Sequence, residues 1–336
     1  MAIRRGQSGA VKYVDEVLAE LTRQTPDAVT GGEVSAVHRG RVATRRMGAA
    51  LEVLGDLVEP HQRQYMRKSL RQIRKSVQDL RDLDVMAEHL EDWQKKGGHA
   101  SAVERMRAVL AEERRRKQLK VAEGAKVPKW LARAGYWLAV RGGLLQQNQQ
   151  IAELIRQSLL EQYAVFAAEA DRLAEGLLSR EKQPGQPQEE SSEEVAGQAI
   201  EPHALRISGK ALRYTFEMAQ RQGLGVSVKT LRRFKRLQDA LGLWHDYHVL
   251  STRVLQQAME EMTNGAYRGD EDELILLAGE ILGQSHVELR QFAGLWQKHS
   301  EPLAGDVARL VDGVVDAVAQ AEQVRNDAND GRITEV

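Results

Sequence analysis

The chain has 336 residues, no cysteine, and 48 basic residues balanced by 48 acidic residues. The length is enough for two ordinary domains, the missing cysteine excludes disulfides and thiolate chemistry, and the zero net charge argues against a generally basic nucleic-acid binder. No apolar run approaches the roughly 20 residues that cross a bilayer, and the N-terminus lacks an apolar signal core, so we expect a cytoplasmic protein without membrane insertion.

Helical periodicity runs along the whole sequence, and no alternating apolar pattern indicates a strand, so the sequence predicts an all-α fold. Glycine and proline divide the helical pattern into segments, and Gly142 with Gly143 are expected to bend one of them. The helices expected in the first half cover residues 8–23, 34–58, 61–94, 100–122 and 128–178. Those expected in the second half cover residues 203–222, 227–262, 270–299 and 302–326.

The stretch from 180 to 202 is rich in Pro, Gln, Glu and Ser and has no apolar period, so we interpret it as a disordered linker. It separates two segments that each supply about four long helices, the number that closes a bundle around an apolar core. The sequence therefore predicts one four-helix bundle over residues 1–179, a second over residues 203–326, and a tail over residues 327–336.

The same basic pattern occurs on two predicted helices, 165 residues apart. The two segments are "VHRGRVATRR" at 37–46 and "HALRISGKALRY" at 203–214. Positions i, i+3 and i+7 project from one side of a helix, so each segment forms a basic stripe. The stripe residues are His38, Arg41, Arg45 and Arg46 in the first segment and His203, Arg206, Lys210 and Arg213 in the second.

A second matching pair of segments lies about thirty residues beyond the stripes, at 69–85 and 233–249. Each has an apolar face that can pack in a bundle core and another face that carries charge. The apolar residues are Leu70, Ile73, Val77 and Leu80 in one segment and Phe234, Leu237, Leu241 and Trp244 in the other. The basic residues of the charged faces are Lys68, Arg71, Lys75, Arg232 and Lys235.

The repeated segments are the basic parts of the chain. Residues 38–81 contain eleven basic and four acidic residues, and residues 203–248 contain nine basic and three acidic residues. Like charges at i and i+4 destabilise a helix by roughly 0.2–0.5 kcal/mol per pair, and Asp82 and Asp246 are too few to balance these cations. A linear polyanion would neutralise many cations at once, and the planar arginine side chain suits phosphate oxygens.

The segments "HRGRVATRR", "LRDLDV", "HALRISGKALRY" and "LQDALGLWHD" resemble the signature segments of the conserved histidine α-helical domain (CHAD) family, over residues 34–325. The resemblance implies two four-helix bundles related by a pseudo-twofold axis, with a basic central cavity that binds inorganic polyphosphate. It implies binding by both stripes and by Arg71 and Lys235 on the second helices. Gly48 stands where the family usually has a basic residue that matches Arg213, so the first copy is expected to bind less strongly at that end.

From the charge pattern and the resemblance together, we expect a non-catalytic protein that binds inorganic polyphosphate and needs no cofactor or metal. Association with polyphosphate granules is left open. The predicted binding residues are His38, Arg41, Arg45, Arg46, Lys68, Arg71, Lys75, His203, Arg206, Lys210, Arg213, Arg232 and Lys235.

Two other functions compete with this one. A helical nucleic-acid-binding protein could use the same basic cavity, but base stacking needs exposed aromatic residues and only Tyr214 lies beside the stripes, so nucleic acid is the less favoured partner. A phosphatase or polyphosphate hydrolase would need a nucleophile and an acidic metal cluster. The sequence contains no Walker loop, H-E-x-x-H or G-x-S-x-G motif, so no catalytic residue is predicted.

Three smaller patterns favour structural roles. His245 and His248 spread apart on a helix, which argues against a metal site. Asp82 and Asp84 point to different faces, so we expect salt bridges rather than paired catalytic carboxylates. The basic cluster at 104–120 is interpreted as a solvated helix face.

Overall fold

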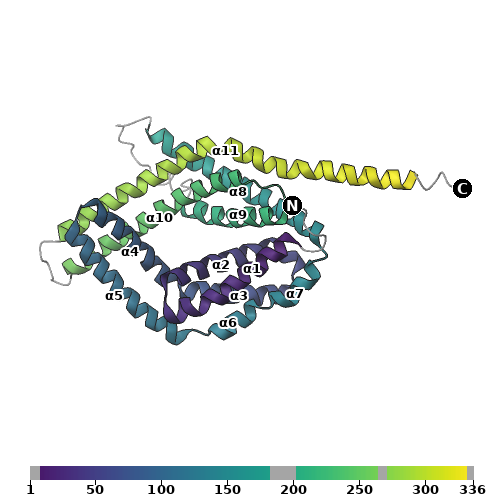
Figure 1. Ribbon diagram of the computed structural model, residues 1–336. Coiled ribbons are helices and arrows are strands. Elements are labelled where there is room, and N and C mark those ends of the chain that lie inside the picture. The colour runs from purple at the N-terminus through teal and green to yellow at the C-terminus, as the bar shows by residue number, and fades with distance from the viewer. Residues whose placement is uncertain (1–7, 182–201, 264–270, 331–336) are drawn as a thin grey trace, which may run out of the picture.

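The computed structural model describes residues 8–181, 202–263 and 271–330, and all regular elements within these ranges are helices (Figure 1). The helices are α1 (Gly9–Pro26), η1 (Asp27–Gly31), α2 (Val34–Val53), η2 (Gly55–Leu57), α3 (Pro60–Ser76), α4 (Gln78–Lys96), α5 (Ala100–Gly124), α6 (Val127–Ala134), α7 (Trp137–Leu144), α8 (Asn148–Glu181), α9 (Pro202–Gln222), α10 (Val228–Thr263) and α11 (Glu271–Asp330). The all-α prediction is confirmed. Among the described residues, no helix combines the length and apolar character that crossing a bilayer needs.

Several helix ends lie where local chemistry favours them. The Ser8 hydroxyl accepts a hydrogen bond from the Val11 amide at the start of α1, and the Glu59 carboxylate accepts one from the Gln62 amide, at 3.0 Å, at the start of α3. Such side chains satisfy amide groups that the first helical turn leaves unpaired. Helix α4 ends at Gly97, whose φ of 84° lies in the left-handed region that favours glycine.

The prediction of a single helix over residues 61–94 is wrong, because the chain breaks at Val77 into α3 and α4. Val77 has φ −104° and ψ 9°, outside the helical region, and its side chain is buried in the core. No glycine or proline marks this break in the sequence. Packing of the valine side chain therefore outweighs the local helical pattern.

The prediction of one bent helix over residues 128–178 is also wrong. The chain forms α6, α7 and α8 instead, and Gly142 and Gly143 lie inside α7 rather than at a bend. The Trp137 side chain at the start of α7 is fully buried, and its indole nitrogen donates a hydrogen bond to Asp15 on α1 at 2.7 Å. This contact holds the start of α7 against α1.

The two helices predicted over residues 270–299 and 302–326 are one helix, α11, with Pro302 inside it. Proline removes one backbone hydrogen bond, which is why the sequence predicts a break there. Trp296 and Leu303, on either side of the proline, are both buried, and the Trp296 indole donates to Asp171 on α8 at 2.7 Å. Packing of both parts of α11 on α8 keeps the helix continuous.

The predicted linker and tail fall mostly on residues 182–201 and 331–336, which lie outside the described residues. At their edges, α8 runs to Glu181, α9 begins at Pro202 and α11 reaches Asp330. The first two residues and the last residue of the predicted linker are therefore helical, as are the first residues of the predicted tail.

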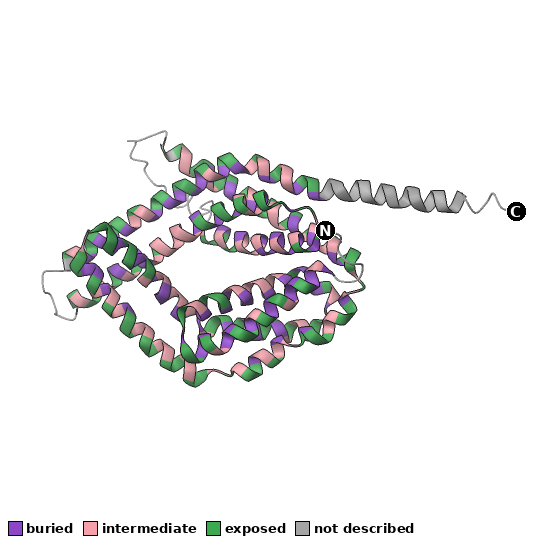
Figure 2. Ribbon diagram, in the orientation of Figure 1, coloured by how far each residue is buried: buried purple, intermediate pink, exposed green. Residues whose placement is uncertain are grey.

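One hydrophobic core joins helices from both halves of the chain. It contains Val14 and Leu51 from the first half and Phe216, Phe234 and Phe292 from the second, all fully buried. Helix α8, which we expected in the first bundle, packs against α9 and α11. Figure 2 shows buried residues where helices meet and exposed residues on the outer faces. The division into two bundles stays a prediction, because packing continues from one half to the other.

A second, smaller core lies where α4 and α5 meet the end of α10 and the beginning of α11. Leu90 and Met106 from the first half pack there with Leu250, Val254 and Leu277 from the second. Figure 1 shows these four helices together at one end of the molecule, with α8 and α9 on one side and α1 to α3 on the other. The two sides are therefore joined at this end.

The start of α1 contacts the end of α9 directly. A Cβ atom at Gly9 would lie 1.9 Å from the carbonyl oxygen of Arg221, so only glycine permits this approach. The Gln222 side-chain oxygen accepts hydrogen bonds from the Ser8 hydroxyl at 3.0 Å and the Ala10 amide at 2.7 Å. These contacts join the two halves a second time.

We predict that Phe234→Ala lowers the free energy of unfolding by about 3–5 kcal/mol, the usual loss when a buried aromatic side chain is truncated. The Phe234 ring packs 5.1 Å from the ring of Phe166 and 5.4 Å from that of Phe216. Urea denaturation measures the loss. Val165→Ala, at a position that is 54% exposed, is the control and should change stability by less than about 0.5 kcal/mol. Similar effects of the two changes would contradict the described core.

Candidate functional site

A cavity of about 1360 Å³ lies between the two sides of the molecule. Its walls come from α1, α2 and α4 on one side and from α9 and α10 on the other. Nine of the side chains that line it are Arg or Lys, and six are Asp or Glu. The basic residues are Arg39, Arg41, Arg45, Arg46, Arg81, Arg206, Lys210, Arg213 and Arg221.

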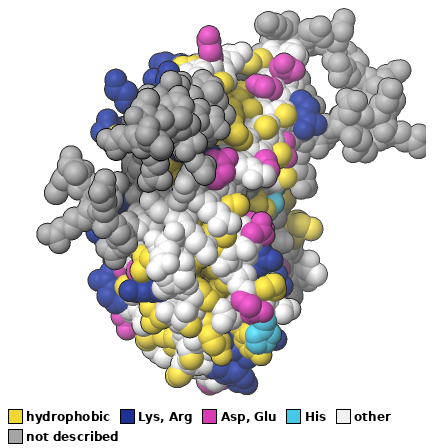
Figure 3. All heavy atoms as spheres, turned by 90° about the vertical axis from the view of Figure 1, so that its right-hand side faces the viewer, with side chains coloured by type: hydrophobic (Ala, Val, Ile, Leu, Met, Phe, Trp, Pro, Cys, Tyr) yellow, Lys and Arg dark blue, Asp and Glu magenta, His cyan; other side chains and the backbone are white. Residues whose placement is uncertain are grey.

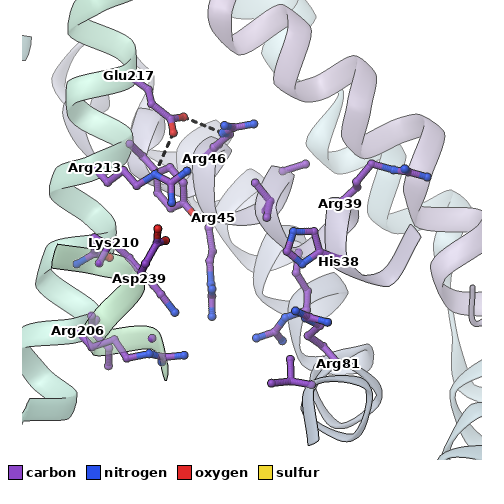
Figure 4. Close-up of a pocket in the computed structure, with 18 of the residues that line it drawn as sticks. His38, Arg39, Arg45, Arg46, Arg81, Arg206, Lys210, Arg213, Glu217 and Asp239 are labelled. Carbon is purple, nitrogen blue, oxygen red and sulfur yellow. Dashed lines mark hydrogen bonds and ion pairs between the residues drawn. The ribbon is translucent and has the colours of Figure 1, made fainter. Parts of the chain in front are cut away.

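Both predicted stripes line this cavity in full, the first from α2 and the second from α9. Figure 4 shows Lys210 and its neighbours on α9 across from Arg45 and its neighbours on α2. The other face of α9 carries Leu205, Leu212 and Phe216, which are fully buried. The prediction that one face of this helix packs in the core is therefore confirmed, and the basic stripe lies on the cavity side.

The predicted basic residues of the second helices are not brought to the cavity. Their side chains are exposed on α3 and α10 and are absent from the cavity lining described here. These residues are Lys68, Arg71, Lys75, Arg232 and Lys235. This part of the cavity wall is formed instead by residues of α4 and of the middle of α10. In the first half, the break at Val77 separates the exposed cations of α3 from α4, the helix that lines the cavity.

Sequence reasoning missed Arg81 on α4 and His245 on α10, which both line the cavity. They precede Asp82 and Asp246, so the repeat places them at matched positions, 164 residues apart. This signal was present in the sequence in the pairs "RD" and "HD". Arginine and histidine differ in type, although their positions in the repeat correspond.

Lys210 is the most strongly perturbed cation of the cavity. Burial lowers its pKa to about 6, and the charges of Arg45 and Arg206 act in the same direction. Burial also lowers the pKa of Arg41 to about 10, again helped by Arg45. Both shifts arise mainly because burial disfavours the charged form, and the neighbouring positive charges add to this effect.

Two carboxylates partly balance these cations. Asp246 lies 3.5 Å from the Arg206 guanidinium and 3.9 Å from His89. On the opposite wall, the Gln78 side chain donates a hydrogen bond to Asp82 at 2.6 Å and accepts one from Arg41. Arg206 therefore contacts an aspartate directly, whereas Arg41 is linked to one through the side-chain amide of Gln78.

A third carboxylate, that of Glu217 on α9, forms hydrogen bonds with one arginine of each stripe. It accepts hydrogen bonds from Arg46 on α2 at 2.9 Å and from Arg213 on its own helix at 3.3 Å (Figure 4). Burial by itself lowers the pKa of Arg46, but the Glu217 charge and hydrogen bond outweigh it, so this pKa is raised. Glu217 thus brings Arg46 of one stripe and Arg213 of the other to the same carboxylate.

The histidines of the second half lie together. The rings of His203 and His245 are 4.9 Å apart, and burial lowers the pKa of His245 to about 4, with Arg206 acting in the same direction. The His245 ring is therefore uncharged near neutral pH. Within the described ranges, no group of three or more His, Asp or Glu side chains has the arrangement of a metal site.

Gln238 also lines the cavity and is 5% exposed, yet neither atom of its side-chain amide has a hydrogen-bond partner in the protein. Its amide nitrogen lies against α9, where a Cβ atom at Gly209 would approach it to 2.0 Å. Buried amide groups without partners cost free energy, so packing against α9 rather than hydrogen bonding holds this side chain in place.

Several charged residues outside the cavity form ion pairs. Asp84 forms an ion pair with Arg114, so the expected salt-bridge role is confirmed for this residue. Arg114 and Lys117 belong to the cluster at 104–120, which we interpreted as a solvated face, but Lys117 binds Asp79 and Arg253 on α10 binds Glu113. Part of this cluster therefore holds α5 to its neighbours. On the surface in Figure 3, basic and acidic side chains are interspersed.

Comparisons with known proteins agree with this fold. The sequence model of the CHAD domain matches residues 12–255. The crystal structure of the CHAD domain from the plant Ricinus communis is similar, with a TM-score of 0.55 and 18% identity over 88% of this chain and 93% of that chain. PptA from Streptomyces chartreusis has a TM-score of 0.54 and 15% identity, over 88% of this chain and 99% of that chain. No curated protein matches the sequence. Because the family match covers well over half of the sequence, the chain belongs to the CHAD domain family.

Proposed function

We propose that the protein binds inorganic polyphosphate in the cavity between α2 and α9, with cations of both halves contacting one polymer. The observation that supports this most directly is the convergence of Arg41 and Arg45 with Arg206 and Lys210 across one cavity. Repulsion among these charges is relieved when anionic groups lie between them. The CHAD family is associated with binding of polyphosphate and triphosphate, which agrees with the proposal.

The two halves contribute equivalent side chains to the proposed site, as expected for a pseudo-twofold arrangement of the repeats. His38 corresponds to His203 and Arg41 to Arg206, each 165 residues apart. A linear polymer whose units are chemically identical can contact equivalent residues on both walls. Arginine is suited to this role because its planar guanidinium can donate two parallel hydrogen bonds to phosphate oxygens.

An inorganic polymer fits the cavity better than a nucleic acid does. Apart from histidine, the aromatic side chains in the described cavity lining are Tyr13 and Tyr214, which are only 6% and 7% exposed. Proteins that bind single strands without sequence preference stack bases on exposed aromatic rings. Two buried tyrosines offer no such surface, whereas phosphate groups need only donors and positive charge.

In this proposal the protein holds the polymer without cleaving it. The carboxylates near the central cations each have a polar partner: Asp246 lies near Arg206, Glu217 binds Arg46, and Asp82 accepts from Gln78. These contacts serve to orient and balance the cations. The same binding mode would let the protein attach to polyphosphate granules.

We predict that polyphosphate binding weakens steeply with salt. If about six phosphate groups are contacted, the slope of log K against log salt should be near −4, by analogy with roughly −0.7 per contact for single strands. Titration at several salt concentrations measures the slope. Single-stranded DNA added in competition should displace the polymer poorly. A slope near zero, or equal affinity for DNA, would contradict the proposal.

We predict that Arg206→Ala weakens polyphosphate binding at least ten-fold, about the contribution of one charge-assisted hydrogen bond. The Arg206 side chain is only 13% exposed, and burial lowers its pKa, so its charge is held in the cavity at an energetic cost. Its loss should change the free energy of unfolding by less than about 1 kcal/mol.

The matched control is Arg232→Ala, which removes an exposed arginine that does not line the cavity. This change should weaken binding less than about two-fold, through long-range charge alone. If both variants lost affinity equally, binding would take place on the outer surface and not in the cavity.

We predict that polyphosphate binding takes up a proton at pH 8. Lys210 has a pKa of about 6 in the free protein and faces Arg45 and Arg41 from α2, Arg206 from α9 and Asp246 from α10. A bound anion favours the charged lysine and raises this pKa, so affinity should increase as the pH falls from about 10 towards 6. Calorimetry in buffers of different ionisation enthalpy measures the uptake. Lys210→Met should abolish it, and equal uptake by this variant would contradict the assignment.

A further inference from the structure

Glu217 pairs with a predicted binding residue from each half of the chain. Its carboxylate accepts from the Nε atoms of Arg46 and Arg213, at 2.9 and 3.3 Å, and from the Tyr13 hydroxyl at 3.4 Å. Figure 4 shows it at the end of the cavity where the two arginines approach each other. The Glu217 side chain is 17% exposed, so its charge is only partly screened by water.

In this position, the carboxylate accepts hydrogen bonds that the two arginines could otherwise donate to a phosphate oxygen. Both groups are anionic acceptors that bind the guanidinium of arginine through short, charge-assisted hydrogen bonds. A phosphate group that enters this end of the cavity must displace Glu217 or remain near its negative charge. In both cases the carboxylate opposes binding, because like charges repel strongly where water is scarce.

The repeat shows that this carboxylate enters the cavity from one half alone. The residue that corresponds to Glu217 in the first half is Glu52, 165 residues earlier. Glu52 forms an ion pair with Arg67, its side chain is 61% exposed, and it is not part of the described cavity lining. The two positions are equivalent and both are glutamate, but Glu52 is exposed on the outer surface whereas Glu217 lines the cavity.

We propose that Glu217 is a built-in competitor for the anionic ligand, which limits how many phosphate groups the cavity binds at the end formed by Arg46 and Arg213. This inference rests on the proposed function. While the carboxylate is in place, the ligand is held by the central cations, among them Arg45 and Lys210. The arginines at the Glu217 end contribute only after their internal partner has been displaced.

The test compares Glu217→Gln with Glu52→Gln, the corresponding change outside the cavity. Each protein is titrated with linear polyphosphate of defined length at several salt concentrations. Glu217→Gln should bind about ten-fold tighter near 0.1 M salt, since a competing charge is gone. Its salt slope should be steeper by about 1.4, for two additional contacts at roughly 0.7 each. Glu52→Gln should match the unchanged protein in affinity and slope.

Equal or weaker binding by Glu217→Gln, with an unchanged slope, would overturn the inference and indicate that Glu217 merely orients the arginines. If the unchanged protein bound no polyphosphate, the proposed function would fail, and the inference with it. If the unchanged protein binds but the variant gains nothing, the inference alone fails. The two failures are therefore distinguishable.

A second measurement does not depend on the folding of the Glu217 variant. In the otherwise unchanged protein, Arg46→Gln should weaken binding several-fold less than Arg45→Gln does, because Glu217 already pairs with Arg46. Arg45→Gln should weaken it about ten-fold, since Arg45 lines the cavity and no ion pair of the described residues involves it. Equal, large losses in both variants would overturn the inference, because Arg46 would then contact the ligand freely.

Discussion

Repulsion among positive charges in a half-buried cavity is the constraint that this structure has to satisfy. Arg45, Arg206 and Lys210 approach one another from two helices, and burial together with the charges of Arg45 and Arg206 lowers the pKa of Lys210 to about 6. The apolar faces of the same helices supply the opposing force. Full burial of one large apolar side chain such as Phe216 contributes roughly 1.5–3 kcal/mol.

Matched positions of the repeat carry different side chains on the two walls of the cavity. Arg45 corresponds to Lys210, and Arg81 corresponds to His245. Arginine keeps its charge at all ordinary pH values, whereas lysine and histidine can give up a proton when they are crowded. On the second wall, Lys210 and His245 therefore lose their charge at a lower pH than they would in water, since burial lowers the pKa of both.

The sequence predicted the helical fold and both basic stripes, because spacing on a single helix decides which side chains project together. It did not predict which residues of the second helices reach the cavity. That depends on the break at Val77 and on the direction of α10, which are set by packing between distant segments. The sequence pattern also could not reveal that Arg46 and Arg213 share Glu217, since this contact joins residues 171 positions apart. The predicted break at Pro302 is absent because packing against distant segments keeps α11 continuous.

Helices α10 and α11 each contribute to both hydrophobic cores. On α11, Leu277 packs in the smaller core and Phe292 in the larger, and α10 contributes Val254 to the smaller core and Phe234 to the larger. A helix shared in this way cannot lose its register in one core without disturbing the other. Although the sequence is built from repeats, which often unfold in steps, the two cores are mechanically coupled, so that unfolding is expected to be a single cooperative transition.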